Sequence, residues 1–418
     1  MYIDYLFLIS SAIMLFISLL YLIAYWDRNK HDPKPQKYYG ITVLVPMWNE
    51  EKTIKKTLSA LKKIKESYKG DLEVIVIDNN SKDSSYSIVK EYSKKNRFVR
   101  VIKETKRQGK SYALNTGIKY AKNELVACVD ADSYPLADAF EHIVGYFDDK
   151  DVGSVTTKMV VNKPRKLVEH FQDLEYIYSN FLLSALDSLN SIYVTKGPLS
   201  VYRKTLLKKI GGFQHLNVTP TEDMEITFRI RKAGYIIRAS KDAKVYTSVM
   251  PTWKRLFWQR IRWNRGSMIN FGLHKDMILN PKYGFFGTIT MPIVTITMFM
   301  IAVLIYYLIN KFYNSIFLLL QKVFYYISFG YLPSINSFFI DFSNGILFVL
   351  PTLFALITII FILWFTLNYI GFKDSKEKIS FKRVVILFFS PIIYLPAQIL
   401  FWVCALIIQI TTKKSRWR

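Results

Sequence analysis

The chain of 418 residues contains only two cysteines, Cys128 and Cys404. They are too far apart in sequence to indicate a metal site, and Cys404 falls within a long apolar run, so a disulfide framework is not expected. The glycine spacing of a Walker P-loop is also absent, which argues against that mode of nucleotide binding. We find no internal repeat and no low-complexity segment, and hence no sign of a repeat array.

Acidic residues are scarce as well, since 32 Asp and Glu stand against 57 Lys and Arg and leave a formal net charge of +25. The excess lies mostly in the middle of the chain and beside the apolar runs. Positive residues next to membrane spans mark the cytoplasmic side and attract anionic lipid headgroups. Such headgroups and a sugar-nucleotide diphosphate explain the charge better than nucleic acid does, so no nucleic-acid partner is expected.

Hydrophobic residues make up 51% of the chain and gather at its two ends. Residues 6–25 form an almost uncharged run that is long enough to cross a bilayer as a helix. No basic segment precedes this run and no small-residue cleavage site follows it, so we expect a retained anchor rather than a signal peptide.

Three later runs are also long enough to span, at residues 286–309, 346–367 and 384–410. Residues 316–332 are less clear because Gln321 and Lys322 interrupt them. The clear runs are apolar on every side, which fits membrane helices better than buried core helices. We therefore expect a multi-pass protein of the cell membrane with at least four spans.

Between the two ends, short β-rich runs alternate with helical segments. We expect strands at residues 41–46, 73–77, 99–103 and 125–129, and helices at 49–65, 84–95 and 111–121. This alternation predicts an α/β fold with a mainly parallel sheet, whose ligands bind beyond the carboxyl ends of the strands. Four polar residues would lie on that edge: Asn49, Asp78, Asp130 and Asp132.

Two long amphipathic helices are expected after the sheet, at residues 166–189 and 252–271. The second interleaves Arg with Trp, which suits a helix in the membrane interface. Packing of this helix on the globular domain is an equally weighted alternative.

We expect four parts in the chain: an N-terminal transmembrane helix at 1–26, a globular domain at 27–250, interfacial helices at 251–284 and a C-terminal transmembrane region at 285–418.

Asp130 and Asp132 flank one small residue directly after a hydrophobic strand. Two carboxylates in a tight turn suit Mg2+ or Mn2+, which take oxygen ligands and commonly share them with a substrate diphosphate. A solvated acidic turn is the alternative, because two aspartates at this spacing often occur by chance.

Three further polar segments are candidates for chemistry. Glu222 and Asp223 precede a helix expected near Met224, where a carboxylate could deprotonate an acceptor hydroxyl, although helix capping explains them as well. Asp78 ends a strand and could accept hydrogen bonds from a base or ribose, with an Asx turn as the alternative. The basic segment 106–110 precedes an expected helix, and this position favours the binding of an anion. An exposed basic turn is the alternative.

Gln259, Arg262 and Trp263 lie within about one helical turn of each other. Arginine pairs bidentately with phosphate oxygens, and an indole face suits stacking against a sugar ring. The alternative is a membrane-interface belt of Trp and Arg, which would use the neighbouring residues equally well.

Taken together these motifs are highly specific, and the chain resembles the membrane-integrated, processive family 2 glycosyltransferases: cellulose, chitin, hyaluronan and poly-N-acetylglucosamine synthases. The resemblance covers about residues 42–272. Asn79 and Asn80 depart from it, because the family more commonly has Asp-Gly there. The matching segments are 45–51, 109–115, 197–200 and 221–223, together with Asp78, Asp130, Asp132, Gln259, Arg262 and Trp263.

The resemblance implies a GT-A fold, a cytoplasmic catalytic domain and inverting transfer from a UDP-sugar to a growing β-linked glycan that leaves through the spans. Asp223 would be the catalytic base, and Asp130 and Asp132 would bind the divalent cation, Mg2+ or Mn2+. The nucleotide-sugar-binding residues would be Pro46, Asn49, Glu50, Asp78, Lys110, Asp130 and Arg262, and the acceptor-binding residues Gly197, Glu222, Gln259 and Trp263.

The sequence leaves the identity of the polymer product open. The segment 221–223 favours poly-N-acetylglucosamine or cellulose-like members, whereas 197–200 favours hyaluronan-like ones. Two alternatives remain: a non-processive transferase that adds a single sugar to a lipid carrier or existing glycan, and a transporter with a degenerate transferase domain. The expected partners are a UDP-sugar donor, a glycan acceptor and the lipid membrane, and an accessory membrane subunit is a further candidate.

Overall fold

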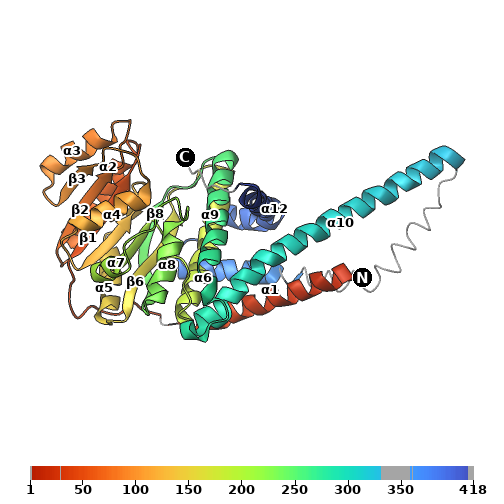
Figure 1. Ribbon diagram of the computed structural model, residues 1–418, viewed down its shortest axis with the longest axis horizontal. Helices are drawn as coiled ribbons and strands as arrows, with labels where there is room; N and C mark the ends of the chain where they lie inside the picture. The colour runs from red at the N-terminus through yellow and green to blue at the C-terminus, as the bar shows by residue number, and fades with distance from the viewer. Residues whose placement is uncertain (1, 29, 331–357, 360, 413–418) are drawn as a thin grey trace. The chain divides into compact units, whose positions relative to one another are not determined.

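The computed structural model describes residues 2–28, 30–330, 358–359 and 361–412 (Figure 1). The chain divides into two compact units. The smaller unit comprises Met1–Leu22 and Pro292–Leu367, and the larger comprises Ile23–Met291 and Asn368–Arg418.

The larger unit is built on an eight-stranded mixed sheet with the strand order β3-β2-β1-β4-β7-β6-β8-β5. The first four strands in the chain are parallel, as predicted: β1 (Ile41–Met47), β2 (Leu72–Asp78), β3 (Val99–Lys103) and β4 (Leu125–Val129). The other half of the sheet contains antiparallel pairs and is not predicted from the sequence: β5 (Ser133–Pro135), β6 (Val152–Val161), β7 (Leu199–Arg203) and β8 (Ile236–Thr247).

The helices predicted between the parallel strands are present, with ends shifted by a few residues: α2 (Ile54–Ser67), α3 (Ser85–Lys95) and α4 (Lys110–Tyr120). The two predicted amphipathic helices are α6 (Leu167–Ser188) and α9 (Trp253–Leu273). Further helices of the larger unit are α5 (Ala139–Val144), η1 (Gly145–Asp148), α7 (Lys204–Lys209), α8 (Glu222–Lys232), η2 (Lys275–Met277), η3 (Pro281–Tyr283), η4 (Phe286–Thr290) and α12 (Phe381–Thr411). Residues 361–374 are also helical, and the end of this helix, from residue 368 on, belongs to the larger unit.

Both faces of the parallel strands β1, β2 and β4 are mostly buried. On one face, Val43 of β1 packs with Leu58 of α2 in the main hydrophobic cluster. On the other face, Leu44 and Ile77 lie against Gly117 of α4, where an added Cβ would be 2.8 and 2.9 Å from their methyl carbons. Gly117 therefore lets α4 approach the sheet closely. Strands covered on both faces are mostly apolar, which is why β1, β2 and β4 appear as nearly continuous hydrophobic runs in the sequence.

The sheet has its topological switch point between β1 and β4. From β1 the chain continues to β2 and β3 on one side, and it then returns to β4 on the other side of β1. The loops that follow β1 and β4 diverge at such a point and leave a crevice in which ligands of α/β sheets bind. Glu50 lies on the first loop, and Asp130 and Asp132 lie on the second.

The segment before α12 is held in the larger unit by buried ion pairs. Asp374 lies 2.9 Å from Lys158 Nζ and 3.3 Å from the Arg28 guanidinium. Arg383, in the first turn of α12, pairs with Asp173 of α6 at 2.8 Å. The helix that ends the described chain thus packs on α6 and α9 rather than standing apart from them.

Two helices of the described chain are long and apolar enough to cross a membrane, by length and composition: Ile9–Trp26 within α1 (Tyr2–Trp26), and α12. They coincide with the predicted runs at 6–25 and 384–410. The run at 286–309 begins in η4 and continues in α10 (Met291–Phe329), which also contains most of residues 316–332. The run at 346–367 lies mostly outside the described residues, so the number of crossings and the four-part division of the chain stay predictions.

Candidate active site

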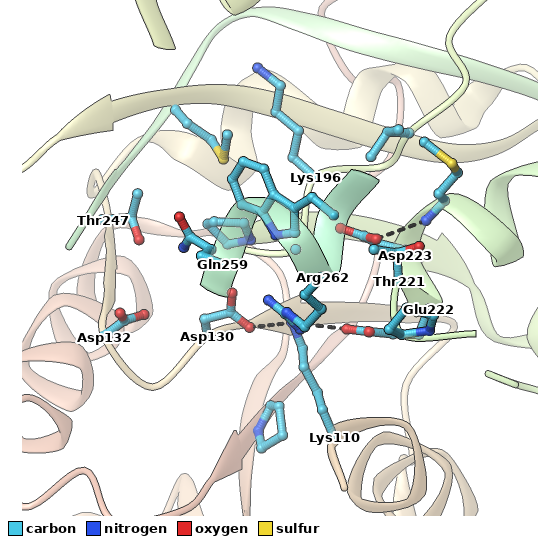
Figure 2. A pocket seen from close by; sticks show the side chains of 18 of the residues that line it. Lys110, Asp130, Asp132, Lys196, Thr221, Glu222, Asp223, Thr247, Gln259 and Arg262 are labelled. Carbon is cyan, nitrogen blue, oxygen red and sulfur yellow. Dashed lines mark hydrogen bonds and ion pairs between the residues drawn. The ribbon is translucent and has the colours of Figure 1, made fainter. Parts of the chain in front are cut away.

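A cavity of about 630 Å3 in the larger unit is lined by the loops after β1 and β4 and by residues of α6, α8 and α9 (Figure 2). Of the predicted site residues, only Asn49 and Asp78 do not line it. Those that do are Pro46, Glu50, Lys110, Asp130, Asp132, Gly197, Glu222, Asp223, Gln259, Arg262 and Trp263.

Asn49 and Asp78 have different surroundings from the lining residues. Asn49 has a positive φ of 55°, and its side-chain oxygen accepts the backbone N–H of Lys82 at 2.8 Å, which ties the loops after β1 and β2 together. Asp78 is fully buried; one of its carboxylate oxygens accepts the N–H of Ser81 at 3.2 Å, and the other has no partner among the described residues. Asn79, the next residue, lines the cavity. The predicted nucleotide-binding roles of Asn49 and Asp78 stay predictions.

Lys110 links two carboxylates that come from distant parts of the chain. Its Nζ lies 2.6 Å from Asp130 Oδ1 and 3.2 Å from Glu222 Oε1 (Figure 2). Burial alone would lower the pKa of Lys110, but these two carboxylates raise it well above its ordinary value. Lys110 therefore supplies a permanent positive charge in the centre of the site.

Asp132 lies in a confined group of carboxylates with Asp130 and Glu50. Burial raises the pKa of Asp132 to about 7, and the negative charges of Asp130 and Glu50 add to the shift. Like charges held together in this way favour a bound cation, because it lowers their mutual repulsion. The oxygen donors of Asp130 and Asp132 are also the ligands that Mg2+ and Mn2+ prefer, so these residues fit a divalent ion.

Asp223 and Glu222 open α8 and differ in their proton affinity. Burial and the adjacent Glu222 raise the pKa of Asp223 to about 6. Burial would also raise the pKa of Glu222, but the positive charges of Lys110 and Arg262 bring it below its ordinary value. Glu222 therefore carries the charge of the pair, and Asp223 is the more basic of the two, as a group that accepts a proton near neutral pH requires.

Helix α9 fixes the loop that carries this pair. Asn270 Nδ2 donates to the side-chain oxygen of Thr221 at 2.9 Å and to its carbonyl oxygen at 3.2 Å. At Gly266 an added Cβ would lie 2.3 Å from Thr221 Oγ1, so only glycine allows this close approach. No sequence motif marks Gly266 or Asn270, because both contact Thr221, which is more than forty positions away.

Gln259, Arg262 and Trp263 reach the cavity from α9. Arg260, which follows Gln259, is buried and orients its neighbours. Its guanidinium donates to Gln259 Oε1 at 2.8 Å, lies 4.1 Å from the centre of the Trp263 ring, and pairs with Glu175 of α6 at 2.6 Å. Helix α9 also packs on α8 and α12, and both placements of this helix, in the membrane interface and on the globular domain, stay predictions.

Arg107 and Trp48 form a further part of the wall. The Arg107 guanidinium lies 3.5 Å from the centre of the Trp48 ring. The following backbone N–H, that of Gln108, donates to Asn79 Oδ1 at 2.9 Å. The basic segment predicted to favour an anion therefore faces the cavity through Arg107.

Another part of the wall is aliphatic. Leu182, Leu183 and Leu186 come from one face of α6, and Ile192 and Val194 come from the loop that follows it. These residues offer no hydrogen bond to a sugar hydroxyl, so this part of the cavity suits an apolar segment of a ligand.

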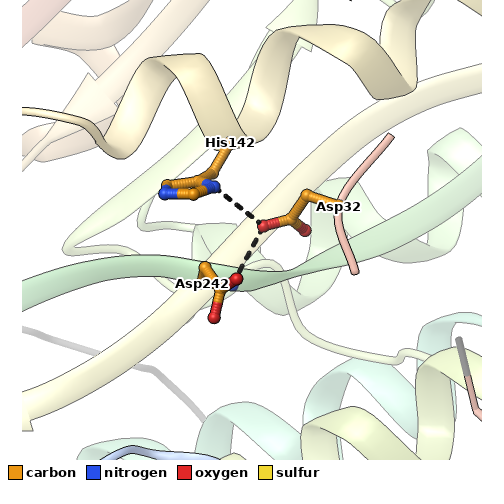
Figure 3. A group of neighbouring side chains, drawn as sticks. All are labelled: Asp32, His142 and Asp242. Atoms are coloured by element: carbon orange, nitrogen blue, oxygen red, sulfur yellow. Dashed lines mark hydrogen bonds and ion pairs between the residues drawn. The ribbon is translucent and has the colours of Figure 1, made fainter. Parts of the chain in front are cut away.

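Within the described chain, Asp32, His142 and Asp242 bring three potential ligand atoms to within 4.8 Å of one another (Figure 3). None of the three lines the cavity. The Asp32 carboxylate already accepts the N–H groups of Lys241 at 2.6 Å and Asp242 at 3.0 Å, and the Tyr146 hydroxyl at 2.8 Å. The cluster therefore fastens the segment before β1 to α5 and β8.

The amino-acid sequence is similar to those of known glycosyltransferases. Residues 42–211 match the family described as Glycosyl transferase family 2. The chain is 32% identical over 250 residues to the Probable glycosyltransferase YdaM of Bacillus subtilis (strain 168), covering 58% of this chain and 57% of that protein. It is 30% identical over 233 residues to a Poly-beta-1,6-N-acetyl-D-glucosamine synthase of Staphylococcus epidermidis, covering 55% of each. The chain thus spans little more than half the length of these relatives.

Among solved structures, the mannosyltransferase PcManGT from Pyrobaculum calidifontis, in complex with GDP-Man and Mn2+, has a TM-score of 0.64 at 20% identity. The match covers 98% of this chain and 100% of that one, and it supports the α/β fold of the GT-A type. From the family match and the fold together, residues 42–211 of this chain form a Glycosyl transferase family 2 domain.

Proposed function

We propose that the protein is a membrane-bound inverting glycosyltransferase that transfers sugar from a UDP-sugar to a growing β-linked polysaccharide. One observation carries the proposal: Asp223, whose pKa is raised to about 6, lines the same cavity as Asp130 and Asp132. A base for the acceptor hydroxyl and a carboxylate pair for a cation are the two groups that this transfer requires. The polysaccharide product is supported by the similarity to poly-beta-1,6-N-acetyl-D-glucosamine synthases.

In the proposed donor site, Asp130 and Asp132 would hold the divalent cation, Mg2+ or Mn2+, and the bound cation would neutralise charge on the diphosphate. Arg262 and Arg107 line the cavity and offer guanidinium groups to phosphate oxygens. Lys110 keeps Asp130 and Glu222 in place through its two ion pairs. GDP-Man and Mn2+ in the PcManGT complex illustrate such a donor and cation on the same fold.

The proposed reaction is a single displacement at the anomeric carbon. Asp223 accepts the proton of the acceptor hydroxyl, the hydroxyl oxygen bonds to the anomeric carbon, and the bond to the UDP oxygen breaks. The nucleophile and the leaving group lie on opposite faces of the sugar, so an α-linked donor gives a β-linked product. Gln259 and Trp263 border the acceptor, with Trp263 held by the Arg260 guanidinium over its ring.

The proposal places the protein in the cell membrane as a multi-pass protein, with the catalytic domain on the cytoplasmic side. The two long apolar helices α1 and α12 support membrane attachment. Passage of the glycan through the transmembrane region and an accessory membrane subunit belong to the same proposal.

The aliphatic wall of the cavity favours one second candidate, the transfer of a single sugar to a lipid carrier. Leu182, Leu183 and Leu186 would suit an aliphatic chain better than a glycan. The two candidates differ in the length of the product.

The test is turnover of the purified full-length protein with a panel of UDP-sugars and either Mg2+ or Mn2+, with products resolved by size. A ladder or long polymer from one donor supports the synthase, and a single added sugar supports the second candidate. Absence of both products and of UDP release in the presence of lipid and glycan acceptors would overturn the proposed function.

A further inference from the structure

Tyr394 of α12 contacts the catalytic domain through both its ring and its hydroxyl group. The ring stacks on that of Phe171 of α6, with centres 5.2 Å apart, and lies 6.2 Å from the Trp253 ring of α9. The hydroxyl donates to Glu175 Oε2 of α6 at 2.5 Å. Tyr394 is only 8% exposed, so its hydroxyl is held within the contact between α6, α9 and α12.

Tyr394 lies between two prolines that interrupt the backbone hydrogen bonds of α12. Pro391 has no N–H, so the carbonyl oxygen of Leu387 loses its usual helical donor. The hydroxyl of Ser390 donates to that oxygen at 2.8 Å instead. Pro396 removes a second backbone donor in the same way. The segment around Tyr394 therefore has fewer backbone bonds than a regular helix, and its side-chain contacts contribute more to its position.

The same oxygen of Glu175 is bonded to Arg260, the buried arginine of α9. Arg260 Nη2 donates to Glu175 Oε2 at 2.6 Å, and the Arg260 side chain is only 3% exposed. A buried guanidinium destabilises the folded protein unless it has a counter-ion, and Glu175 supplies one. The Nε of Arg260 is buried and has no hydrogen-bond partner among the described residues, so the two terminal nitrogens set the direction of the group.

The remaining contacts of Arg260 are with the wall of the cavity. Its Nη1 donates to Gln259 Oε1 at 2.8 Å, and its guanidinium carbon lies 4.1 Å from the centre of the Trp263 ring. Gln259 and Trp263 line the cavity, whereas Tyr394, Glu175 and Arg260 do not. The hydroxyl on α12 is thus joined to two residues of the cavity wall by a continuous chain of polar and ring contacts.

We propose that Tyr394 and Glu175 are positioning residues, which act through Arg260. They hold Gln259 and the Trp263 ring in the orientation that receives the acceptor. This makes the acceptor side of the cavity depend on α12, a helix long and apolar enough to cross a membrane. The proposal rests on the proposed function, because it concerns the acceptor side of the same site. Its effects fall on the acceptor and on Trp263 rather than on donor binding.

The first measurement reports on Trp263 without turnover. The full-length protein in detergent micelles is labelled with fluorotryptophan, and the fluorine NMR resonance of Trp263 is assigned by its loss in Trp263→Phe. Tyr394→Phe removes one hydroxyl and keeps the stacked ring. Tyr92→Phe is the matched control, because Tyr92 of α3 also donates one hydrogen bond, to the Leu58 carbonyl oxygen at 3.2 Å, and does not line the cavity.

We expect Tyr394→Phe and Glu175→Gln to shift or broaden the Trp263 resonance, and Tyr92→Phe to leave it unchanged. Arg260→Met removes the link, so adding Tyr394→Phe to it should cause no further change. A Trp263 resonance that is the same in Tyr394→Phe and wild type would overturn the proposal, and so would an undiminished effect of Tyr394→Phe in the Arg260→Met background. If Arg260→Met does not fold, the comparison of Tyr394→Phe with Tyr92→Phe decides.

The second measurement is steady-state kinetics with UDP-N-acetylglucosamine, Mn2+ and an N-acetylglucosamine oligosaccharide as acceptor, a choice that follows the similarity to poly-beta-1,6-N-acetyl-D-glucosamine synthases. Loss of a hydrogen bond to a charged group should raise the acceptor KM of Tyr394→Phe by about three- to tenfold, with kcat and UDP affinity nearly unchanged. An acceptor KM equal to that of the wild type would refute the role in acceptor binding. If the wild type releases UDP from no UDP-sugar at all, the proposed function fails, whereas the resonance of Trp263 still decides whether Tyr394 positions that ring.

Discussion

At the scale of single residues, the proton affinity of Asp223 sets a pH dependence. A base must be deprotonated to act, and the pKa of Asp223 is raised to about 6 by burial and by Glu222. We therefore expect kcat/KM to rise about tenfold per pH unit below 6 and to level off above it. Asp223→Asn should lower kcat by about a thousandfold, with UDP affinity retained. Initial rates from pH 5 to 8 and UDP titrations measure both effects; a variant with near-normal turnover would remove Asp223 as the base.

Asp132 leads to a second prediction, on metal binding. Its pKa is raised to about 7 by burial and the neighbouring carboxylates, and a protonated carboxyl is a poor ligand. Mn2+ affinity should therefore increase as the pH rises through 7, and Asp132→Asn should abolish this increase and the metal dependence of UDP binding. Mn2+ titrations at pH 6 and 8 test this, with the exposed Asp138→Asn as control. Metal-dependent UDP binding that persists in Asp132→Asn would contradict the assignment.

At the scale of elements, helix α9 positions the base through a close contact. An added Cβ at Gly266 would lie 2.3 Å from Thr221 Oγ1, so Gly266→Ala must displace Thr221 and the adjacent Glu222 and Asp223. Since a misplacement of about 1 Å can cost on the order of a hundredfold in rate, we expect a large decrease in kcat with UDP affinity nearly unchanged. Gly272→Ala is the matched control in the same helix, because no atom lies within 4 Å of its added Cβ. Equal kcat values in the two variants would show that α9 does not position the base.

The elements also show what could be predicted from the sequence. Strands β1, β2 and β4 were predictable because they are mostly buried on both faces and therefore mostly apolar, and β3 was predictable from its short run of Val and Ile although it is only partly buried. β6 and β8 were not, because they mix buried polar residues such as Thr157 and Lys158 with apolar ones and so show neither an alternating nor a continuous apolar pattern. That the motif residues gather at one cavity was predictable because each motif is contiguous. The part played by Arg260 was not, because it depends on a tertiary contact with Glu175 of α6.

At the scale of the whole larger unit, one buried carboxylate joins distant parts of the chain. Asp374, before α12, contacts Lys158 of β6 at 2.9 Å, Ser184 of α6 at 2.8 Å and Arg28 at 3.3 Å. These groups are almost entirely buried apart from Arg28, so the network lies outside the screening effect of solvent. It fastens the segment before α12 to the catalytic domain.

The network gives the final prediction. Asp374→Asn leaves Lys158 buried without a counter-ion, a change that typically costs about 3–5 kcal/mol, so we expect a clearly lower Tm. Adding Lys158→Met removes the orphaned charge and should recover much of that loss, because an apolar replacement of a buried pair is often tolerated. Thermal unfolding of the two variants, of Lys158→Met alone and of wild type completes the cycle. If the double variant is no more stable than Asp374→Asn, the carboxylate acts mainly through Arg28 and Ser184, and the Lys158 pair is not what fastens α12 to the domain.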